Sequence, residues 1–577
     1  MRLNIGQWRC VRIYATYAFH AKGMHILDVA WQEAALRIDL SFNRLLRPTK
    51  STRPASKSKR KQLQVTVAAA VDVATRPEET AFVDDSLVLG PSSLTRASPE
   101  TVIEQEHGAR GSFNWQKNWY PVQLVENLDA KVPYAFDLLG KRLVLWRDAE
   151  EQWRCFEDKC PHRLAPMSEG RIHRDGTLMC SYHGWRFQGD GACVDIPQSL
   201  DAKANATARA SPRSCIKAHP VKVSQDKVWV WGDCSPSAII DCQMVQPVLN
   251  PFLADVPGIQ GIDGSEMLEV DRAMMRDLPY SWDCLVENVI DPSHVNWSHH
   301  NHIGERGHEM SGHMLMIPGV QPSNIPWPEH SFSVAVESFV KGAKGMEKWE
   351  VHFFAPGLAV WTLPMPWGTG ILTLHCVPTL PGKSRVFASL YTAANTVPLP
   401  LRIMFRHFVC GWWEHIHGGL TILDGDAQLI LGQSYANMEE ESPKAAYYMP
   451  AQADRLVSKF RRWLEGEGGG GPMARAPLPP MEKRKDVLLE RWHSHTAQCK
   501  TCQKGFKIVR AAQLAAIALA AVLAFGLAAA LGQGTAPVSR ASACLVAGMT
   551  ACGAAWLALQ RLAQSFIYVE WNHALNE

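Results

Sequence analysis

Two short pairs of metal-ligating residues in the segment Cys160–Trp185 constrain the fold of this chain more than any other feature. The first pair is Cys160 and His162, and the second pair is Cys180 and His183. Two thiolates and two imidazoles in this order match a Rieske [2Fe–2S] cluster, in which the cysteines bind one iron and the histidines bind the other. The alternative is a structural zinc site, but Cys2His2 zinc sites usually pair Cys with Cys and His with His.

Short β-strands are expected on both sides of these ligand loops. Residues 135–146 have the pattern of a hairpin that turns at Gly140 and Lys141, and residues 227–231 have the pattern of a closing strand. Ligand loops at one end of short strands are typical of a small antiparallel domain. We therefore expect a Rieske domain over residues 113–235.

The length of the chain, 577 residues, exceeds what one hydrophobic core supports, so a second folded domain is expected. Its 59 Lys and Arg nearly balance its 56 Asp and Glu, and the net charge of +3 argues neither for nor against nucleic-acid binding. The 15 cysteines form no regular framework, and no secretory signal is visible, which we take to indicate a reducing compartment.

The composition of residues 1–76 differs from that of the rest of the chain. Between Ser41 and Ala70 there are no acidic residues, whereas Arg, Lys, Ser and Thr abound. This predicts a chloroplast or mitochondrial transit segment, followed by a polar linker over residues 77–112. The basic run Lys57–Lys61 is also compatible with a nuclear signal, but two apolar C-terminal stretches and metal motifs favour an organelle, and we expect no nucleic-acid partner.

A second set of candidate ligands is Asp291, His294 and His299, with the spacing D-x2-H-x4-H. The segment is expected to be helical, with Pro292 at a helix start or a kink. Two histidines and one carboxylate form the facial triad of non-haem Fe(II) oxygenases, which leaves positions open for O2. The alternative is a polar loop that is merely rich in histidine, since further histidines crowd the same region.

The carboxylate of the triad must then come from elsewhere in the chain, and the stretch 423–433 offers candidates. This stretch is expected to be helical and follows the β-rich residues 331–394. Asp424 and Asp426 are both candidates. We favour Asp426, because apolar residues lie three and four positions away on both sides and indicate an inward-facing side chain. The alternative role for either residue is a helix N-cap. We expect the catalytic domain to span residues 236–465.

The C-terminal part begins with a Gly/Pro-rich linker over residues 466–490 and a segment over residues 491–510 that contains Cys499-x-x-Cys502. A single CxxC is compatible with a redox pair, half of a metal site or two ordinary thiols. No second CxxC is present to complete a zinc site, and we favour the redox pair.

Two uncharged stretches follow, and residues 511–532 and 541–560 are each long enough to span a bilayer. They predict a transmembrane helical hairpin with both ends on one side of the membrane. Basic residues before the first stretch favour that side as the stromal or cytoplasmic face. The alternative is a soluble helical hairpin, since both stretches are rich in Ala.

Four motifs together resemble the plant and algal Rieske non-haem oxygenases of the pheophorbide a oxygenase family. They are CPHRLAPMSEG, CSYHGW, ENVIDPSH and LDGDAQLILGQ. The resemblance runs from about Trp115 to the C-terminus and includes the CxxC and the two apolar stretches. It implies an α+β fold: a small antiparallel β Rieske domain, an α+β (helix-grip-like) catalytic domain and a C-terminal two-helix membrane anchor.

The resemblance also implies a role for each candidate residue. The two Cys/His pairs are expected to hold the [2Fe–2S] cluster, and His294, His299 and Asp426 are expected to hold a mononuclear Fe(II). Asp291 is then not a ligand but a hydrogen-bonded electron-transfer bridge between a cluster histidine of one subunit and an iron histidine of its neighbour. This arrangement implies a homotrimer.

The implied reaction is the oxygenolytic ring opening of pheophorbide a in chlorophyll breakdown, with O2 and electrons from reduced ferredoxin. One alternative is a related Rieske hydroxylase that acts on protochlorophyllide or a phyllobilin. An alternative of another class is a membrane redox or import-associated protein that only transfers electrons. The implied location is a chloroplast membrane, thylakoid or inner envelope, with the catalytic body facing the stroma.

Overall fold

The computed structural model describes residues 113–256, 259–306, 308–309, 330–340, 346–407, 409–474, 476–532 and 540–573. All of these residues belong to one compact unit. The predicted transit segment (1–76) and the predicted linker (77–112) lie outside the described residues.

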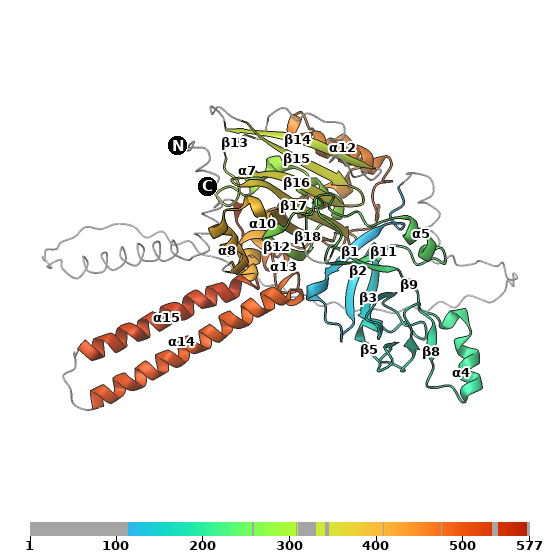
Figure 1. The fold of residues 1–577 in the computed structure, drawn as a ribbon, viewed down its shortest axis with the longest axis horizontal. Helices are drawn as coiled ribbons and strands as arrows, with labels where there is room; N and C mark the ends of the chain where they lie inside the picture. The colour runs from blue at the N-terminus through green and yellow to red at the C-terminus, as the bar shows by residue number, and fades with distance from the viewer. Residues whose placement is uncertain are drawn as a thin grey trace, which may run out of the picture. The chain divides into compact units, whose positions relative to one another are not determined.

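Three small antiparallel sheets form the N-terminal part of the described chain (Figure 1). The first sheet has the order β1 (Trp119–Leu124), β11 (Lys227–Trp231), β10 (Val221–Ser224). The second has the order β2 (Tyr134–Leu138), β3 (Lys141–Arg147), β4 (Trp153–Glu157), β9 (Ala218–His219). The third has the order β5 (Arg171–Ile172), β6 (Leu178–Met179), β7 (Arg186–Phe187), β8 (Cys193–Asp195). Helix α4 (Ala202–Arg209) lies between β8 and β9 in the chain, and α5 (Ala238–Met244) follows β11.

Aromatic and β-branched side chains explain why these strands form. Trp146, Trp229 and Trp231 are among the largest fully buried side chains, and such residues pack well on a pleated surface. The hairpin turn that was predicted at Gly140 and Lys141 lies one residue earlier, because Leu139 and Gly140 adopt the positive φ angles of 51° and 78°. Lys141 is therefore already the first residue of β3.

A seven-stranded antiparallel sheet forms the second part of the fold (Figure 1). Its order is β12 (Met267–Leu278), β18 (Ser384–Ala393), β17 (Gly368–Pro378), β16 (Leu358–Met365), β15 (Met346–Phe354), β14 (Ser331–Val340) and β13 (His308–Glu309). The middle strands are apolar on both faces, which requires cover on both sides. We therefore expect helices to pack against this sheet.

Helices α6 (Trp282–Val289), α10 (Leu420–Glu439) and α12 (Arg455–Glu465) cover one face, where their apolar side chains share one core with the sheet. The other face packs on residues of the N-terminal sheets and of the segment before β12. Two indoles fix α6 against the strands: Trp282 Nε1 donates to the Cys376 carbonyl at 3.0 Å, and Trp361 Nε1 donates to the Val289 carbonyl at 2.8 Å. Shorter helices among the described residues of this part are α7 (Val295–Ser298), α8 (Leu399–His407), α9 (Gly411–Glu414), α11 (Pro443–Ala446) and α13 (Lys485–Leu488).

A buried charge cluster holds α10 against strand β12 and the C-terminal segment. The carboxylate of Asp424 lies 2.6 Å from a guanidinium nitrogen of Arg276 and 2.6 Å from one of Arg491. Arg491 also donates to the carbonyls of Ile416 and Ser565. All three charged side chains are almost fully buried, so the ion pairs compensate a large loss of hydration.

The Gly/Pro-rich segment that was predicted to be a linker packs against the folded part of the chain. The backbone N–H of Phe113 donates to the Glu467 carbonyl at 3.1 Å, and Trp115 Nε1 donates to the Gly468 carbonyl at 2.8 Å. The Tyr435 hydroxyl also donates to the Pro479 carbonyl at 2.5 Å. The first two contacts connect the start of the Rieske part to the residues after α12, and the third connects α10 to the Gly/Pro-rich segment.

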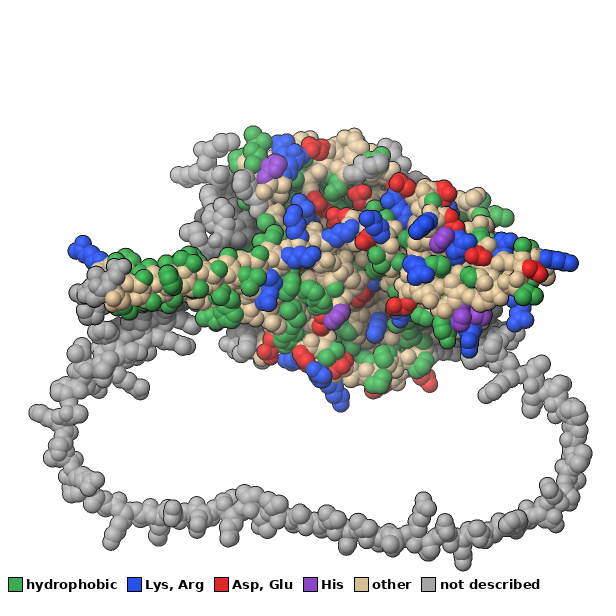
Figure 2. Space-filling model, turned by 90° about the horizontal axis from the view of Figure 1, so that it is seen from below, with side chains coloured by type: hydrophobic (Ala, Val, Ile, Leu, Met, Phe, Trp, Pro, Cys, Tyr) green, Lys and Arg blue, Asp and Glu red, His purple; other side chains and the backbone are tan. Residues whose placement is uncertain are grey.

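The last two helices, α14 (Lys500–Gly532) and α15 (Arg540–Ser565), run side by side (Figure 1). Both are long and apolar enough to cross a membrane, and their apolar windows are almost wholly exposed. Figure 2 shows hydrophobic side chains along this pair. Both helices are longer than the predicted stretches 511–532 and 541–560, because α14 begins among the residues around Cys502 that pack on the body.

The predicted fold class is confirmed. A small antiparallel β domain carries the Rieske ligand loops, a mixed α/β region follows, and two apolar helices end the described chain.

The charge cluster makes a prediction about stability. Asp424→Ala leaves two guanidinium groups buried without their carboxylate, and we expect the free energy of unfolding to fall by about 3–5 kcal/mol. Denaturant unfolding followed by circular dichroism measures this change. The exposed Glu150 is the control residue, and Glu150→Ala should change the free energy by less than about 0.5 kcal/mol. Equal effects of the two substitutions would contradict a structural role for Asp424.

Candidate functional site

The two Cys/His loops have the same backbone geometry. In the first loop, Cys160 N–H donates to the Ala165 carbonyl and Leu164 N–H donates back to the Cys160 carbonyl, both at 2.8 Å. In the second loop, Cys180 N–H donates to the Trp185 carbonyl and Gly184 N–H donates back to the Cys180 carbonyl, both at 2.9 Å. The residue four positions after each cysteine has a positive φ angle, 60° at Leu164 and 74° at Gly184. The two loops are therefore a matched pair that approaches a common centre from two sides.

The four candidate ligands divide into a buried pair and a pair near the surface. Cys160 and Cys180 are buried, whereas His162 is exposed and His183 is half-buried. The imidazole rings of His162 and His183 lie edge to face with their centroids 4.5 Å apart. The indole of Trp185 stacks on His162 with centroids 4.7 Å apart, which limits rotation of that ring.

The local environment favours one thiolate at this centre, because the hydrogen bond between the two cysteines raises the pKa of Cys160 and lowers that of Cys180. The pKa of Cys180 is lowered to about 5, first by the hydrogen bond with Cys160 and also by backbone N–H groups of Tyr182 and His183. N–H groups directed at sulfur are what an anionic iron–sulfur cluster requires. The residues therefore fit a [2Fe–2S] group with its thiolates inside and its imidazoles toward the surface.

The second candidate site combines two residues of the segment that follows α6 with one residue of α10. His294 ends the 3-10 turn η4 (Pro292–His294), in which Pro292 occupies the first position, as predicted. His299 directly follows α7, and Asp426 lies in the second turn of α10. The ligand atoms of His294, His299 and Asp426 all lie within 4.8 Å of one another.

The geometry of these three side chains fits one metal ion. His299 Nε2 lies 3.2 Å and His294 Nε2 lies 4.0 Å from Asp426 Oδ2. His299 is fully buried, and among the described residues neither of its ring nitrogens makes a hydrogen bond. A buried imidazole whose ring nitrogens make no hydrogen bond is costly, and a metal ion would remove this cost. Two histidines and one carboxylate on one side of the ion leave its other side open.

Gly425 permits the close approach of α10 to this site. A Cβ atom at this position would lie 3.0 Å from His299 Nδ1 and 3.1 Å from the ring of Trp571. A larger residue between Asp424 and Asp426 would therefore push His299 away from Asp426. Three consecutive residues thus have different roles. Asp424 supplies a structural carboxylate, Gly425 permits a close contact and Asp426 is a candidate ligand.

The structure separates the two aspartates that the sequence left as alternatives. Asp426 points to the histidines, whereas Asp424 points to Arg276 and Arg491. Both residues lie inside α10, so the N-cap alternative is wrong for both. The geometry favours Asp426 as the ligand.

Asp291 lies beside His294 without joining the three-residue group. Its Oδ2 atom is 4.0 Å from His294 Nδ1, and that ring nitrogen contacts the Asp291 carbonyl. The Oδ1 atom accepts hydrogen bonds from the N–H and hydroxyl of Ser293 at 2.8 and 2.5 Å. About a quarter of the Asp291 side chain is exposed, 26%, so Oδ2 remains accessible to another molecule.

Cys499 and Cys502 lie in a third group of metal-binding side chains together with His415 and His495. The sequence interpretation missed both histidines. His495 precedes Cys499 by one helical turn, and the pattern H-x3-C-x2-C was a usable local signal. His415 gave no such signal, because 84 positions separate it from Cys499.

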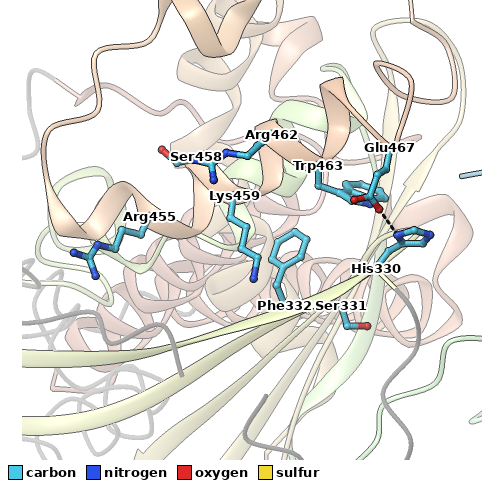
Figure 3. Close-up of a pocket in the computed structure, with 9 residues that line it drawn as sticks. All are labelled: His330, Ser331, Phe332, Arg455, Ser458, Lys459, Arg462, Trp463 and Glu467. Carbon is cyan, nitrogen blue, oxygen red and sulfur yellow. Dashed lines mark ion pairs between the residues drawn. The ribbon is translucent and has the colours of Figure 1, made fainter. Parts of the chain in front are cut away.

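A hollow of about 810 Å³ lies between β14 and α12 (Figure 3). Helix α12 contributes Arg455, Lys459 and Arg462 to its wall. At its edge, His330 Nδ1 lies 2.6 Å from Glu467 Oε2. None of the predicted cluster or iron ligands lines this hollow, so it belongs to neither site.

Comparisons with known proteins identify the family of each part of the chain. The family model of the Rieske [2Fe-2S] domain matches residues 118–205, and that of pheophorbide a oxygenase matches residues 339–444. The Rieske match contains both Cys/His loops, so the zinc alternative for these loops is wrong. A [2Fe–2S] cluster and a non-haem iron are therefore the cofactors of this chain.

Three relatives illustrate how far the similarity extends. The chain is 33% identical over 496 residues to a chloroplastic pheophorbide a oxygenase of Arabidopsis thaliana, which covers 80% of this chain and 87% of the relative. It is 30% identical over 514 residues to that of Oryza sativa subsp. japonica, with 84% and 90% covered. It is also 30% identical over 503 residues to the chloroplastic flavonoid 8-hydroxylase 2 of Ocimum basilicum, with 83% and 89% covered.

The separation of the two aspartates makes a prediction about iron content. Asp426→Ala should lower the mononuclear iron from about one atom per chain to nearly none, because two imidazoles alone bind Fe(II) weakly. The visible absorption of the cluster should remain. Asp424→Ala, measured in the fraction that folds, should keep the mononuclear iron. The opposite pattern would transfer the ligand role to Asp424. Iron analysis combined with electron paramagnetic resonance of the reduced cluster distinguishes the two pools.

Proposed function

Because the chain belongs to the pheophorbide a oxygenase family of Rieske non-haem iron oxygenases, we propose that it oxygenates a chlorophyll-derived tetrapyrrole. The proposed reaction is the oxygenolytic ring opening of pheophorbide a. The observation that carries this proposal is the presence of two separate ligand sets in one chain, the Cys/His loops and the group of His294, His299 and Asp426. Electron transfer alone requires only the first set.

Each ligand set has a distinct task in this proposal. Cys160 and Cys180 hold the buried side of the cluster, while His162 and His183 hold the side near the surface. His294, His299 and Asp426 would hold the iron, and this ligand set leaves positions open for O2. When bound, the cluster supplies electrons one at a time and the iron supplies the site of O2 activation.

Asp291 is proposed to connect the two sites across a subunit boundary. Its carboxylate lies beside His294, keeps an accessible oxygen atom and is fixed on its other side by Ser293. A carboxylate between two imidazoles fixes their orientation and provides a short route for the electron. Such a route needs a cluster histidine from a neighbouring subunit, and the exposed His162 suits that role. We therefore propose a homotrimer that receives its electrons from reduced ferredoxin.

The two apolar helices are proposed to anchor the enzyme in a chloroplast membrane. Their exposed side chains are hydrophobic, which suits a lipid environment (Figure 2). Lys504, Lys507 and Arg510 are exposed at the start of α14, where positive charge favours the stromal face. The relatives named above are chloroplastic. A membrane location also suits a hydrophobic tetrapyrrole substrate.

A second candidate function keeps the chemistry and changes the substrate. The flavonoid 8-hydroxylase is as similar to this chain in identity as the rice pheophorbide a oxygenase. Hydroxylation of a flavonoid, of protochlorophyllide or of a phyllobilin therefore belongs in the same substrate test. A pure electron carrier is disfavoured, because His294, His299 and Asp426 would then have no task.

The proposed reaction predicts incorporation of oxygen from O2. Purified protein with reduced ferredoxin, pheophorbide a and isotopically labelled O2 should yield a ring-opened product that carries the label. Mass spectrometry of the product measures this incorporation. The Asp426→Ala protein is the control and should give no labelled product.

The same assay with a panel of substrates decides between the candidates. Label in a flavonoid or another tetrapyrrole, but not in pheophorbide a, would replace the ring-opening proposal with a hydroxylase. Reduction of the cluster without label in any substrate would favour the electron carrier.

The proposed bridge predicts a variant with intact metals and little turnover. Asp291→Ala should keep both iron pools and lower the turnover rate by about 100-fold, because the route between the two imidazoles is lost. The matched control is Ser293→Ala, which removes the hydrogen bond to Asp291 Oδ1 but keeps the carboxylate. This control should retain most of the activity. Full turnover by Asp291→Ala would contradict the bridge.

A further inference from the structure

We propose that Cys499, Cys502, His415 and His495 bind one Zn²⁺ ion in a closed structural site. This site is separate from the cluster and from the mononuclear iron, and it shares no residue with either. All four candidate ligands are buried, with at most 3% of any residue exposed. Four protein ligands without access to solvent are typical of structural zinc sites, whereas catalytic sites keep one position open.

The distances between the ligand atoms match a tetrahedron around a single ion. Cys502 Sγ lies 3.2 Å from His495 Nε2 and 3.3 Å from His415 Nδ1, and Cys499 Sγ lies 3.6 Å from His415 Nδ1. Zinc bonds of about 2.3 Å to sulfur and about 2.0 Å to nitrogen place neighbouring S and N atoms about 3.6 Å apart in a tetrahedron. In a Rieske cluster the thiolates and imidazoles bind different irons, which separates S from N much further. The short distances therefore indicate one ion.

Hydrogen bonds around the four residues orient the candidate ligand atoms toward one another. His495 Nδ1 donates to the Met275 carbonyl at 2.6 Å, which leaves the lone pair of Nε2 directed at the cysteines. An imidazole whose other nitrogen donates to a carbonyl is the usual arrangement of a zinc-bound histidine. The N–H of Cys502 also points to Cys499 Sγ at 3.4 Å, as in many CxxC metal loops.

The same facts disfavour the redox pair that the sequence suggested. Redox-active cysteines are partly exposed, because a partner thiol must reach the sulfur. Cys499 and Cys502 are 3% and 0% exposed, and His415 and His495 cover the sulfurs. With Zn²⁺, two thiolates and two neutral imidazoles have no net charge, so the site can be buried without a further counter-ion.

The position of the site suggests its purpose. His415 begins the π-helical turn η6 (His415–Gly419), which leads directly into the iron-binding helix α10, and π turns are frequent at functional sites. Cys502 lies in the first turn of α14. A Cβ on Gly505 would lie 2.3 Å from Trp412, so α14 packs tightly on α9 next to the site. Zinc would fasten the first turn of the membrane helix to the start of the catalytic helix.

The test begins with the unmodified full-length protein in detergent, with its cofactors loaded. We expect about one zinc atom in addition to about three irons per chain. X-ray absorption at the zinc edge does not detect iron and should give two sulfur atoms at about 2.3 Å and two nitrogen atoms at about 2.0 Å. This measurement needs no variant and remains informative if substitutions prevent folding.

A pair of variants then assigns the site. Cys502→Ala should lower the zinc content at least about tenfold without changing the iron content, because three ligands bind zinc far more weakly than four. The matched control is Cys410→Ala, which removes an exposed cysteine just before α9 and should keep its zinc.

Three outcomes would overturn the proposal. The first is unmodified protein without zinc, and the second is a further iron atom bound by the same four residues. The third is a disulfide between Cys499 and Cys502, detected by mass spectrometry of unreduced peptides. None of these outcomes depends on the substrate or on oxygenase activity, so the zinc site and the proposed function can fail independently.

Discussion

The buried carboxylate of Asp424 is the interaction on which much of this structure depends. It is held between Arg276 of β12 and Arg491 of the C-terminal segment, where water cannot replace either partner. Since a buried charge tolerates little displacement, these ion pairs fix both the position and the rotation of α10. That rotation directs Gly425 and Asp426 at His299. The candidate ligands His299 and Asp426 are therefore positioned by ion pairs in which neither takes part.

The same cluster connects parts of the chain that are distant in sequence. Arg491 donates to the carbonyls of Ile416, just before α10, and of Ser565, at the end of α15. The segment between Arg491 and Cys502 then returns to the body through His495, which donates to the Met275 carbonyl of β12. Strand β12, helix α10 and both apolar helices thus meet around the buried charge cluster of Asp424, Arg276 and Arg491. The C-terminal helices are an integral part of this fold and are not joined to it by a free tether.

The sequence predicted groups of residues that are close together in the chain better than groups that only the fold brings together. Cys160 with His162 and Cys180 with His183 were recognisable because both members of each pair occupy one short loop. The apolar residues three and four positions from Asp426 indicated a buried side chain, but Asp424 is buried as well, so burial alone does not distinguish the two aspartates. His415 was missed, because only the folded chain brings it to Cys499. The Gly/Pro-rich segment was taken for a linker because composition does not reveal which carbonyls accept hydrogen bonds, as those of Glu467 and Gly468 do.

The continuity of α14 has a mechanical consequence. Its 33 residues run without interruption from the cysteine pair to the end of the apolar stretch, a length of about 50 Å. This length exceeds the hydrocarbon core of a bilayer, about 30 Å, so an α14 that spans a membrane would extend beyond the lipid chains at its first turns. Because the helix is unbroken, any change in tilt also turns its first residues, which pack against α9 and His415. The packing of these first residues on the body therefore restricts the tilt that the whole helix can adopt.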